Sequence, residues 1–392
     1  MSLTIDEIET VSFTYPVDDA RMDPSAGKLM YSPGETYERT AHGVRITTEN
    51  GLRGEYIGAT GVGLTQIDLC AEYLLGRNPL KREKHWDAMQ QILRKYDQMG
   101  LGPIDIALWD LAGKYYDAPI HELLGTYRER LPAYASTYFA ERGRGFDSPE
   151  AFADFAETCL DHGYPAFKTH TWSDEAPSDI QQEIELIRAV GERVGDRMQL
   201  MHDPVCSYET FADAVRVGRE CDKYDYFWYE DPFKDGGRSQ HAHKRLAQRI
   251  DTPLLQTELV RGLEPTVDFL ASGGTDFARA DPDWDGGITG AMKLARAAEG
   301  HGLDIEYHLA GPAQRHCMAA TRNSNYYELG LVHPDSPLPH TEAPIYQGGY
   351  TDRIDSIDED GTVGVPEGPG LGVEYDWEYV RENETGKTVY SR

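Results

Sequence analysis

Short apolar runs alternate with longer amphipathic segments from about residue 130 onward. The runs are YASTYF, AFKTH, MQLMHD, YFWYED, PLLQTE, DFARAD, LDIEYH and NYYELG. The segments between them, such as DIQQEIELIRAVGERVG, carry apolar residues at three-and-four spacing and stop at glycine, which is typical of amphipathic helices. Eight strand–helix units in about 200 residues predict an α/β fold, a (β/α)8-type TIM barrel over residues 129–345.

A different pattern precedes the barrel. TIDEIETVSFTY and YERTAHGVRITTENGLRGEYIG alternate apolar and polar residues, which predicts antiparallel strands. LTQIDLCAEYLLG and HWDAMQQILRKYDQM have helical spacing, and IDIALWDLAGKYY is apolar on several sides, as in a buried helix. Residues 1–128 are therefore expected to form a separate α+β domain. The Gly-, Pro- and acid-rich residues 346–392 are expected to return to it.

Charge excludes some classes of partner. Asp and Glu outnumber Lys and Arg 67 to 38, a formal charge of −29, which argues against nucleic acid or an anionic membrane as partner. The acidic residues are spread along the chain, and this suits a halophilic cytoplasm. No apolar run is long enough for a membrane helix, and no signal pattern is visible. Five cysteines without a CxxC pair favour reduced thiols in a cytoplasmic protein.

Ionisable residues stand at the ends of most of the apolar runs. Lys168 and His170 close the second run, and they point to one side because strand side chains alternate. The later runs each supply one residue: Asp203, Glu230, Glu258, Asp281, His308 and Glu328. From Asp203 onward these residues follow one another at intervals of 20 to 28 positions. Strand C-termini share one face of a barrel, where active sites lie, so we expect these side chains to converge.

The chemistry of these residues points to proton transfer beside a metal. Asp203, Glu230 and Glu258 would form an oxygen site for one Mg²⁺ ion. Asp281 on the strand next to His308 would fix the tautomer of that imidazole and raise its basicity. Bases on two sides of a metal-bound carboxylate can reach both faces of its α-carbon, and the cation stabilises the charge formed when the α-proton leaves.

Several motifs are familiar together. GPIDIALWDLAGK, FKTH, LMHDP, WYEDP, LLQTE, RADPDWDGGIT, IEYHL and YYEL follow one another along the chain. This set resembles the enolase superfamily, mandelate racemase subgroup, over essentially the whole length. The resemblance implies an enolase-like modified barrel with an N-terminal capping domain. It also implies a homo-oligomer, such as a dimer or an octamer.

The resemblance also implies residue roles. The three carboxylates would be the Mg²⁺ ligands, and His308 would be an acid/base oriented by Asp281. Lys168 would lower the pKa of its partner, position 170 would be the second acid/base, and Glu328 would hydrogen-bond the substrate carboxylate. The family's racemase has lysine where this chain has His170. That difference leaves open whether the protein is a racemase and which residue on this strand is the base.

Relatives with this set of residues are mostly acid-sugar dehydratases, which form 2-keto-3-deoxy sugar acids. We therefore expect an Mg-dependent hydro-lyase acting on a small acid sugar. Racemisation, epimerisation or cycloisomerisation by the same groups is the alternative, and a non-catalytic sugar-acid-binding barrel lies outside this class. Two other barrel enzymes are disfavoured. A metal hydrolase would favour histidine metal ligands, whereas the three predicted ligands are carboxylates. A Schiff-base aldolase would need a lone lysine, whereas Lys168 stands beside His170.

Substrate specificity is expected to come from the N-terminal domain. Residues 14–34 are rich in turn residues and are expected to form a loop that closes over the barrel mouth. Possible substrate contacts are Arg21, Lys28, Tyr31 and Tyr138. The alternative for each is a side chain that faces solvent and has no substrate role.

Overall fold

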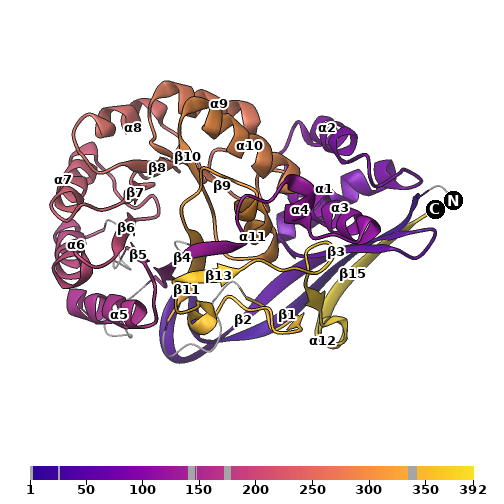
Figure 1. The fold of residues 1–392 in the computed structure, drawn as a ribbon, viewed down its shortest axis with the longest axis horizontal. Helices are drawn as coiled ribbons and strands as arrows, with labels where there is room; N and C mark the ends of the chain where they lie inside the picture. The colour runs from indigo at the N-terminus through magenta and orange to yellow at the C-terminus, as the bar shows by residue number, and fades with distance from the viewer. Residues whose placement is uncertain (1–2, 25–26, 140–145, 147, 172–177, 334–341) are drawn as a thin grey trace.

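The computed structural model describes residues 3–24, 27–139, 146, 148–171, 178–333 and 342–392. Figure 1 shows a ring of strands and helices at one side and an antiparallel sheet with its own helices at the other. The N and C labels lie close together at the outer end of that sheet. The expected fold class, a TIM-type barrel with an N-terminal capping domain, is confirmed.

The capping domain is built on a four-stranded antiparallel sheet in the order β15-β1-β2-β3. Its strands are β1 (Ile5–Asp23), β2 (Lys28–Thr48), β3 (Arg53–Ala59) and β15 (Glu384–Ser391). Its helices are α1 (Gly61–Leu74), α2 (Arg82–Leu93), α3 (Leu101–Tyr116) and the short α4 (Ile120–Leu124). The apolar α3 is buried along most of its length because it packs between this sheet and the barrel.

The expected loop over residues 14–34 is wrong. β1 and β2 pair from Ile5↔Thr48 to Asp23↔Lys28, so the segment is a long hairpin. Two of its turn-forming residues, Asp19 and Gly34, instead mark an irregularity within the pairing: Asp19 has φ of 53°, and its carboxylate accepts the N–H of Gly34 at 2.7 Å. A bulge uses the same residue types as a loop, so composition did not separate them.

The barrel contains parallel strands in the order β10-β9-β8-β7-β6-β5-β4-β11. They are β4 (Arg130–Thr137), β5 (Ala166–His170), β6 (Gln199–Asp203), β7 (Trp228–Glu230), β8 (Leu254–Gln256), β9 (Phe277–Ala280), β10 (Asp304–Tyr307) and β11 (Tyr327–Val332). Each contains residues of one of the predicted apolar runs. Five fully buried side chains gather between the strands and fill the barrel: Tyr134, Ala166, Met201, Trp228 and Leu255.

Helices cover the outside of the strands (Figure 1). They are α5 (Pro149–Asp161), α6 (Ile180–Val194), α7 (Phe211–Asp222), α8 (Gln240–Ala247), α9 (Leu263–Ser272), α10 (Gly287–His301) and α11 (Pro312–Ala319). Side-chain caps begin several of them, such as Ser148 before α5 and Thr210 before α7. The residues that follow β9 and β10 face the capping domain across a cavity.

The C-terminal part makes contact with both domains. Its elements are β12 (Tyr346–Gln347), the 3-10 turn η1 (Ile354–Ser356), β13 (Thr362–Gly364), β14 (Glu374–Tyr375) and α12 (Trp377–Glu382), followed by β15. β13 pairs with barrel strand β4, and β15 pairs with β1 of the capping sheet. The divisions at residues 128 and 345 stay a prediction.

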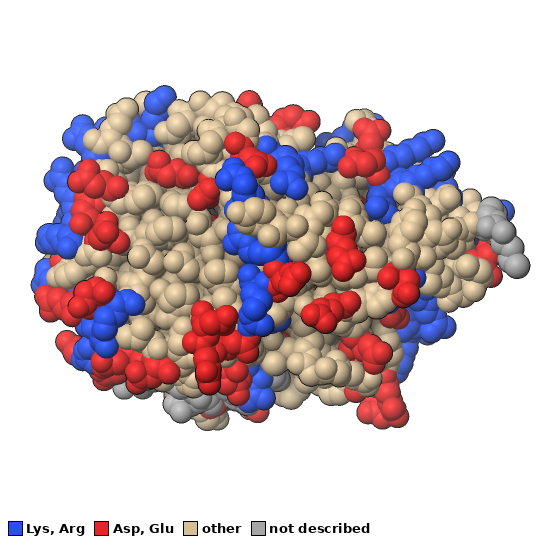
Figure 2. All heavy atoms as spheres, in the orientation of Figure 1, with Lys and Arg blue, Asp and Glu red and all other residues tan. Residues whose placement is uncertain are grey.

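Charged side chains are mixed on the face drawn in Figure 2, where red and blue patches alternate. An origin at high salt stays a prediction. All five cysteines are free, and four of them are buried. Among the described residues, no helix is long and apolar enough to cross a membrane.

The two domains meet where α3 lies against the segment that joins β9 to α10. A Cβ atom added to Gly102 of α3 would lie 2.2 Å from the carbonyl oxygen of Asp283. The Asp105 carboxylate accepts hydrogen bonds from the backbone N–H and the hydroxyl of Thr289, at 2.8 and 2.7 Å. The close approach therefore depends on a residue without a side chain.

Replacing this glycine should weaken the domain contact. Gly102→Ala places a methyl group against backbone that cannot rotate away, so we expect a loss of about 2–3 kcal/mol in the free energy of unfolding. Gly300→Ala in α10 is the matched control, because nothing lies within 4 Å of its added Cβ and alanine should stabilise the helix by about 0.5–1 kcal/mol. Urea unfolding measures both, and equal effects would contradict the packing argument.

Candidate active site

Three carboxylates from neighbouring strands meet at the barrel mouth. Asp203 ends β6, Glu230 ends β7, and Glu258 follows β8. One oxygen from each lies within 4.8 Å of the others. Glu230 is fully buried and Asp203 is 4% exposed. An all-carboxylate set of this size fits a hard divalent cation such as Mg²⁺, because such ions prefer oxygen ligands.

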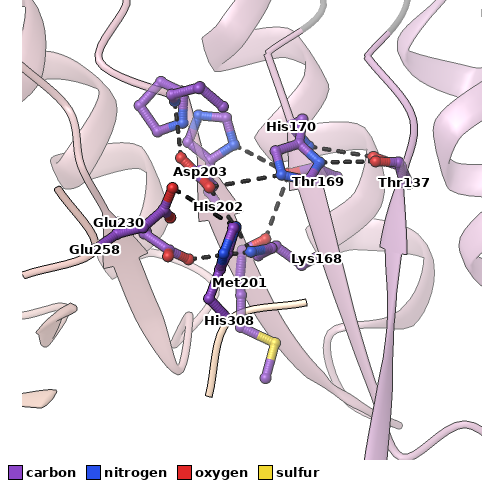
Figure 3. Close-up of polar contacts among 12 residues, drawn as sticks. Thr137, Lys168, Thr169, His170, Met201, His202, Asp203, Glu230, Glu258 and His308 are labelled. Carbon is purple, nitrogen blue, oxygen red and sulfur yellow. Dashed lines mark hydrogen bonds and ion pairs between the residues drawn. The ribbon is translucent and has the colours of Figure 1, made fainter. Parts of the chain in front are cut away.

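Lys168 points into this carboxylate cluster (Figure 3). Its Nζ lies 3.1 Å from Glu328 Oε1, 3.2 Å from Glu230 Oε2 and 3.7 Å from Asp203 Oδ2. Burial alone would lower the pKa of the amine, but Glu230 and Glu328 outweigh it and raise the pKa well above its usual value. The Lys168 side chain is therefore held as a cation, and its nitrogen has no lone pair with which to accept a proton.

His170, on the same strand, has a different environment. Its Nδ1 lies 2.7 Å from the carbonyl oxygen of Thr137. Figure 3 draws this contact as a dashed line. A carbonyl can only accept, so Nδ1 carries the proton and Nε2 carries the lone pair. That Nε2 lies 3.5 Å from Asp203 Oδ2. Burial, with the Phe139 ring centroid 4.6 Å from the imidazole, lowers the pKa of His170.

His308 stands on the other side of the cluster, directly after β10. Its Nδ1 lies 2.7 Å from Asp281 Oδ2, and its Nε2 lies 3.6 Å from Glu258 Oε1. Burial lowers the pKa of this imidazole, but Glu258 and the hydrogen bond to Asp281 raise it more, to about 9. The Trp284 ring lies against it at 4.9 Å between centroids. The pKa of His170 is thus lowered and the pKa of His308 is raised.

Glu328 of β11 faces the cluster from the remaining side. Its Oε2 accepts the backbone N–H of Leu309 at 2.9 Å, and its Oε1 pairs with Lys168. Burial would raise the pKa of Glu328, but Lys168 and Arg279 lower it well below its usual value. Glu328 is therefore an anion that helps to hold Lys168 charged.

Arg279 was missed by the sequence analysis. It is fully buried inside the barrel, and its guanidinium donates to Glu230 at 2.6–2.8 Å. Its Nη atoms also reach the hydroxyl of Tyr134 at 3.3 Å. The alternation of strand side chains was the available signal, since Arg279 stands two residues before Asp281 and so faces the same side. Together with Lys168, its cation balances the charge of the buried Glu230 carboxylate.

The proposed substrate contacts lie on the hairpin and beside it. Tyr31 is buried, stacked on His333 at 3.7 Å between ring centroids, and lies 6.1 Å from the Tyr138 ring. Arg21 pairs with Met30 across the hairpin, near its tip at Asp23↔Lys28. A substrate role for Arg21, Lys28, Tyr31 and Tyr138 stays a prediction.

Two family models match this chain. Residues 151–380 match "Enolase C-terminal domain-like", and residues 31–125 match "Mandelate racemase / muconate lactonizing enzyme, N-terminal domain". The first model spans more than half of the sequence. The chain belongs to the enolase superfamily, mandelate racemase subgroup. The resemblance inferred from its motifs is confirmed.

Relatives of this enolase-superfamily chain include enzymes of acid-sugar metabolism. D-galactarolactone cycloisomerase of Agrobacterium fabrum is 28% identical, over 86% of this chain and 90% of its own length. D-xylonate dehydratase of Haloferax volcanii is 26% identical, over 88% and 86%. A solved structure of D-glucarate dehydratase from Agrobacterium tumefaciens complexed with magnesium has a TM-score of 0.87 and 27% identity, covering 98% of this chain and 100% of that one.

The metal site can be tested without any substrate. Glu258→Gln removes one charged ligand from the carboxylate cluster, so we expect Mg²⁺ and Mn²⁺ affinity, measured by isothermal titration calorimetry, to fall about tenfold or more. Glu209→Gln is the matched control, because this exposed carboxylate pairs with Lys234 outside the cluster. Equal affinity in both variants would exclude Glu258 as a ligand.

Proposed function

We propose that this protein is an Mg²⁺-dependent acid-sugar dehydratase. One observation carries the proposal: two imidazoles face the same carboxylate cluster from two sides, His170 with its Nδ1 on a backbone carbonyl and His308 with its Nδ1 on the Asp281 carboxylate. Groups whose environments separate their pKa values are suited to act as base and acid of one reaction. His170 is suited to accept a proton at Nε2, and His308 is suited to donate one.

Proton removal is the first step. His170 Nε2 takes the proton from the α-carbon, and the electron pair of the broken C–H bond moves toward the substrate carboxylate. A magnesium ion held by Asp203, Glu230 and Glu258 would stabilise the negative charge that the carboxylate gains. Lys168 is assigned to the same charge, because its Nζ is held protonated beside the cluster.

Loss of the 3-hydroxyl is the second step. The C3–O bond breaks, and the hydroxyl leaves as water with the proton that His308 donates from Nε2. Asp281 keeps the imidazole oriented through Nδ1. The enol product then tautomerises to a 2-keto-3-deoxy acid. The net change is the loss of one water molecule, with one proton gained by His170 and one lost by His308.

A second candidate uses the same proton removal. The similarity to a D-galactarolactone cycloisomerase supports cycloisomerisation, and bases on two sides of the α-carbon would also serve a racemase or an epimerase. A barrel that only binds sugar acids would need no pair of imidazoles on two sides of the carboxylate cluster. The substrate, the homo-oligomeric state and the cytoplasmic location stay predictions.

Product analysis tests the proposal most directly. Aldonic and aldaric acids of four to six carbons are offered with Mg²⁺, and 2-keto acid is measured for the wild type and for His308→Asn. We expect turnover of one stereochemical family and a loss of at least about a hundredfold in the variant, the usual range for a general acid. Exchange of the α-proton in D₂O without any keto acid would favour the racemase alternative. No turnover and no exchange would leave the binding protein.

The pH dependence should separate the two histidines. Dehydration needs His170 neutral and His308 protonated, so kcat/KM should rise with pH up to the lowered pKa of His170, below 6.5, and fall as His308 deprotonates. The alkaline limb should lie at or below pH 9, since a divalent cation would offset Glu258, which raises the pKa of His308 to about 9. Exchange of the α-proton should lack this limb. An alkaline limb common to both reactions would contradict the assignment of His308.

A further inference from the structure

The segment from Asp281 to Thr289 holds the partner of the proposed general acid. Asp281 uses Oδ2 for His308 and Oδ1 to accept the backbone N–H of Asp283, at 2.7 and 2.8 Å. Its own N–H donates to Asp285 Oδ2 at 2.8 Å. Trp284 of the same turn lies against the His308 ring. The position of this turn therefore sets the direction of the Asp281 carboxylate.

The capping domain grips the same turn from several elements. The Tyr56 hydroxyl of β3 donates to Asp283 Oδ2 at 2.9 Å, and the Trp86 indole of α2 donates to the carbonyl of Gly286 at 2.8 Å. From α3, Asp105 accepts from Thr289, as described above. These bonds come from residues far apart in the sequence, so they form only when the capping domain is docked on the barrel.

Tyr56 is connected to the Asp281–His308 pair through a single residue. It bonds the side chain of Asp283, whose backbone N–H holds Asp281. Tyr56 is 3% exposed, and burial together with Asp283 raises the pKa of its hydroxyl well above the usual value, so the hydroxyl keeps its proton and donates. Both side chains line a cavity of about 350 Å³ between the domains.

We propose that Tyr56 of the capping domain is a positioning residue for His308, acting through Asp283 and the carboxylate of Asp281. This inference rests on the proposed function, in which His308 is the general acid. Docking of the capping domain then does more than cover the substrate. It completes the orientation of a proton donor that belongs to the barrel.

The first test compares two reactions of one variant. Tyr56→Phe removes only the hydroxyl, so in the full-length, Mg²⁺-loaded protein dehydration should slow about tenfold or more, because small misplacements of catalytic groups cost that much. Exchange of the α-proton in D₂O, which needs His170 and not His308, should stay within about twofold. A variant that was merely less folded would lose both reactions equally, and that result would overturn the proposal.

Tyr15→Phe is the matched control. Tyr15 is buried and lines the same cavity from β1. Tyr15→Phe also removes one tyrosine hydroxyl from this cavity, but none of the hydrogen bonds described above for residues 281–289 involves Tyr15. The ratio of the dehydration rate to the exchange rate should therefore not change. An equal change of this ratio in both variants would overturn the role of Tyr56.

A change of leaving group isolates the proton donor. In a 3-deoxy-3-fluoro analogue, base-catalysed loss of the α-proton expels fluoride, which leaves without a proton from His308. Tyr56→Phe should therefore eliminate fluoride at nearly the wild-type rate while losing dehydration. Equal losses with both leaving groups would show that Tyr56 does not act through the general acid.

A spectroscopic measurement keeps the inference testable if no acid sugar is turned over. The Nδ1–H proton of His308, which faces Asp281, can be observed in protein with ¹⁵N-labelled histidine and assigned with His308→Asn. We expect this resonance to shift or broaden in Tyr56→Phe and to stay in place in Tyr15→Phe. An unchanged resonance in Tyr56→Phe would overturn the positioning role. Absence of turnover and exchange in the wild type would count against the proposed function alone.

Discussion

Charge balance in a buried barrel mouth is the constraint on which the other features depend. Glu230 and Glu328 are almost completely removed from water, and an unpaired buried carboxylate is costly. Lys168 and Arg279 supply the opposite charges from two other strands, β5 and β9. The strands must keep their register for these groups to meet, so the electrostatics of the site and the geometry of the barrel support each other.

The same charge balance gives Lys168, His170 and His308 different protonation states. Lys168 is committed to the carboxylates as a cation, which leaves His170, tied to a backbone carbonyl, as the group with a lone pair. His308 lies between two carboxylates and keeps its proton more firmly. A histidine in place of the family racemase's second lysine thus suits the proposed function, in which the base and the acid are separate residues.

Much of the barrel and of its site could be predicted from the sequence, because local patterns of apolar and charged residues mark both. Apolar runs at regular intervals located each strand, and the residue at the end of each run located the carboxylates, Lys168 and His308.

The hairpin over residues 14–34 could not be predicted in this way, because its length depends on the pairing of β1 with β2 and not on local composition. Arg279 was missed for a related reason: a charged residue is expected in a core only when its partner, here Glu230 from a distant strand, is known. The hold of the capping domain on Asp283 depends on tertiary contacts that no local pattern encodes.

The pairing of β15 with β1 has a consequence for the order in which the protein is made. The capping sheet is started by β1 and β2 but is finished by a strand that the ribosome adds only after every barrel strand. During synthesis the outer edge of β1 offers unpaired backbone groups to any other extended chain. The barrel therefore has to be translated while this edge of β1 is unpaired, and during that interval nascent chains can mispair with one another.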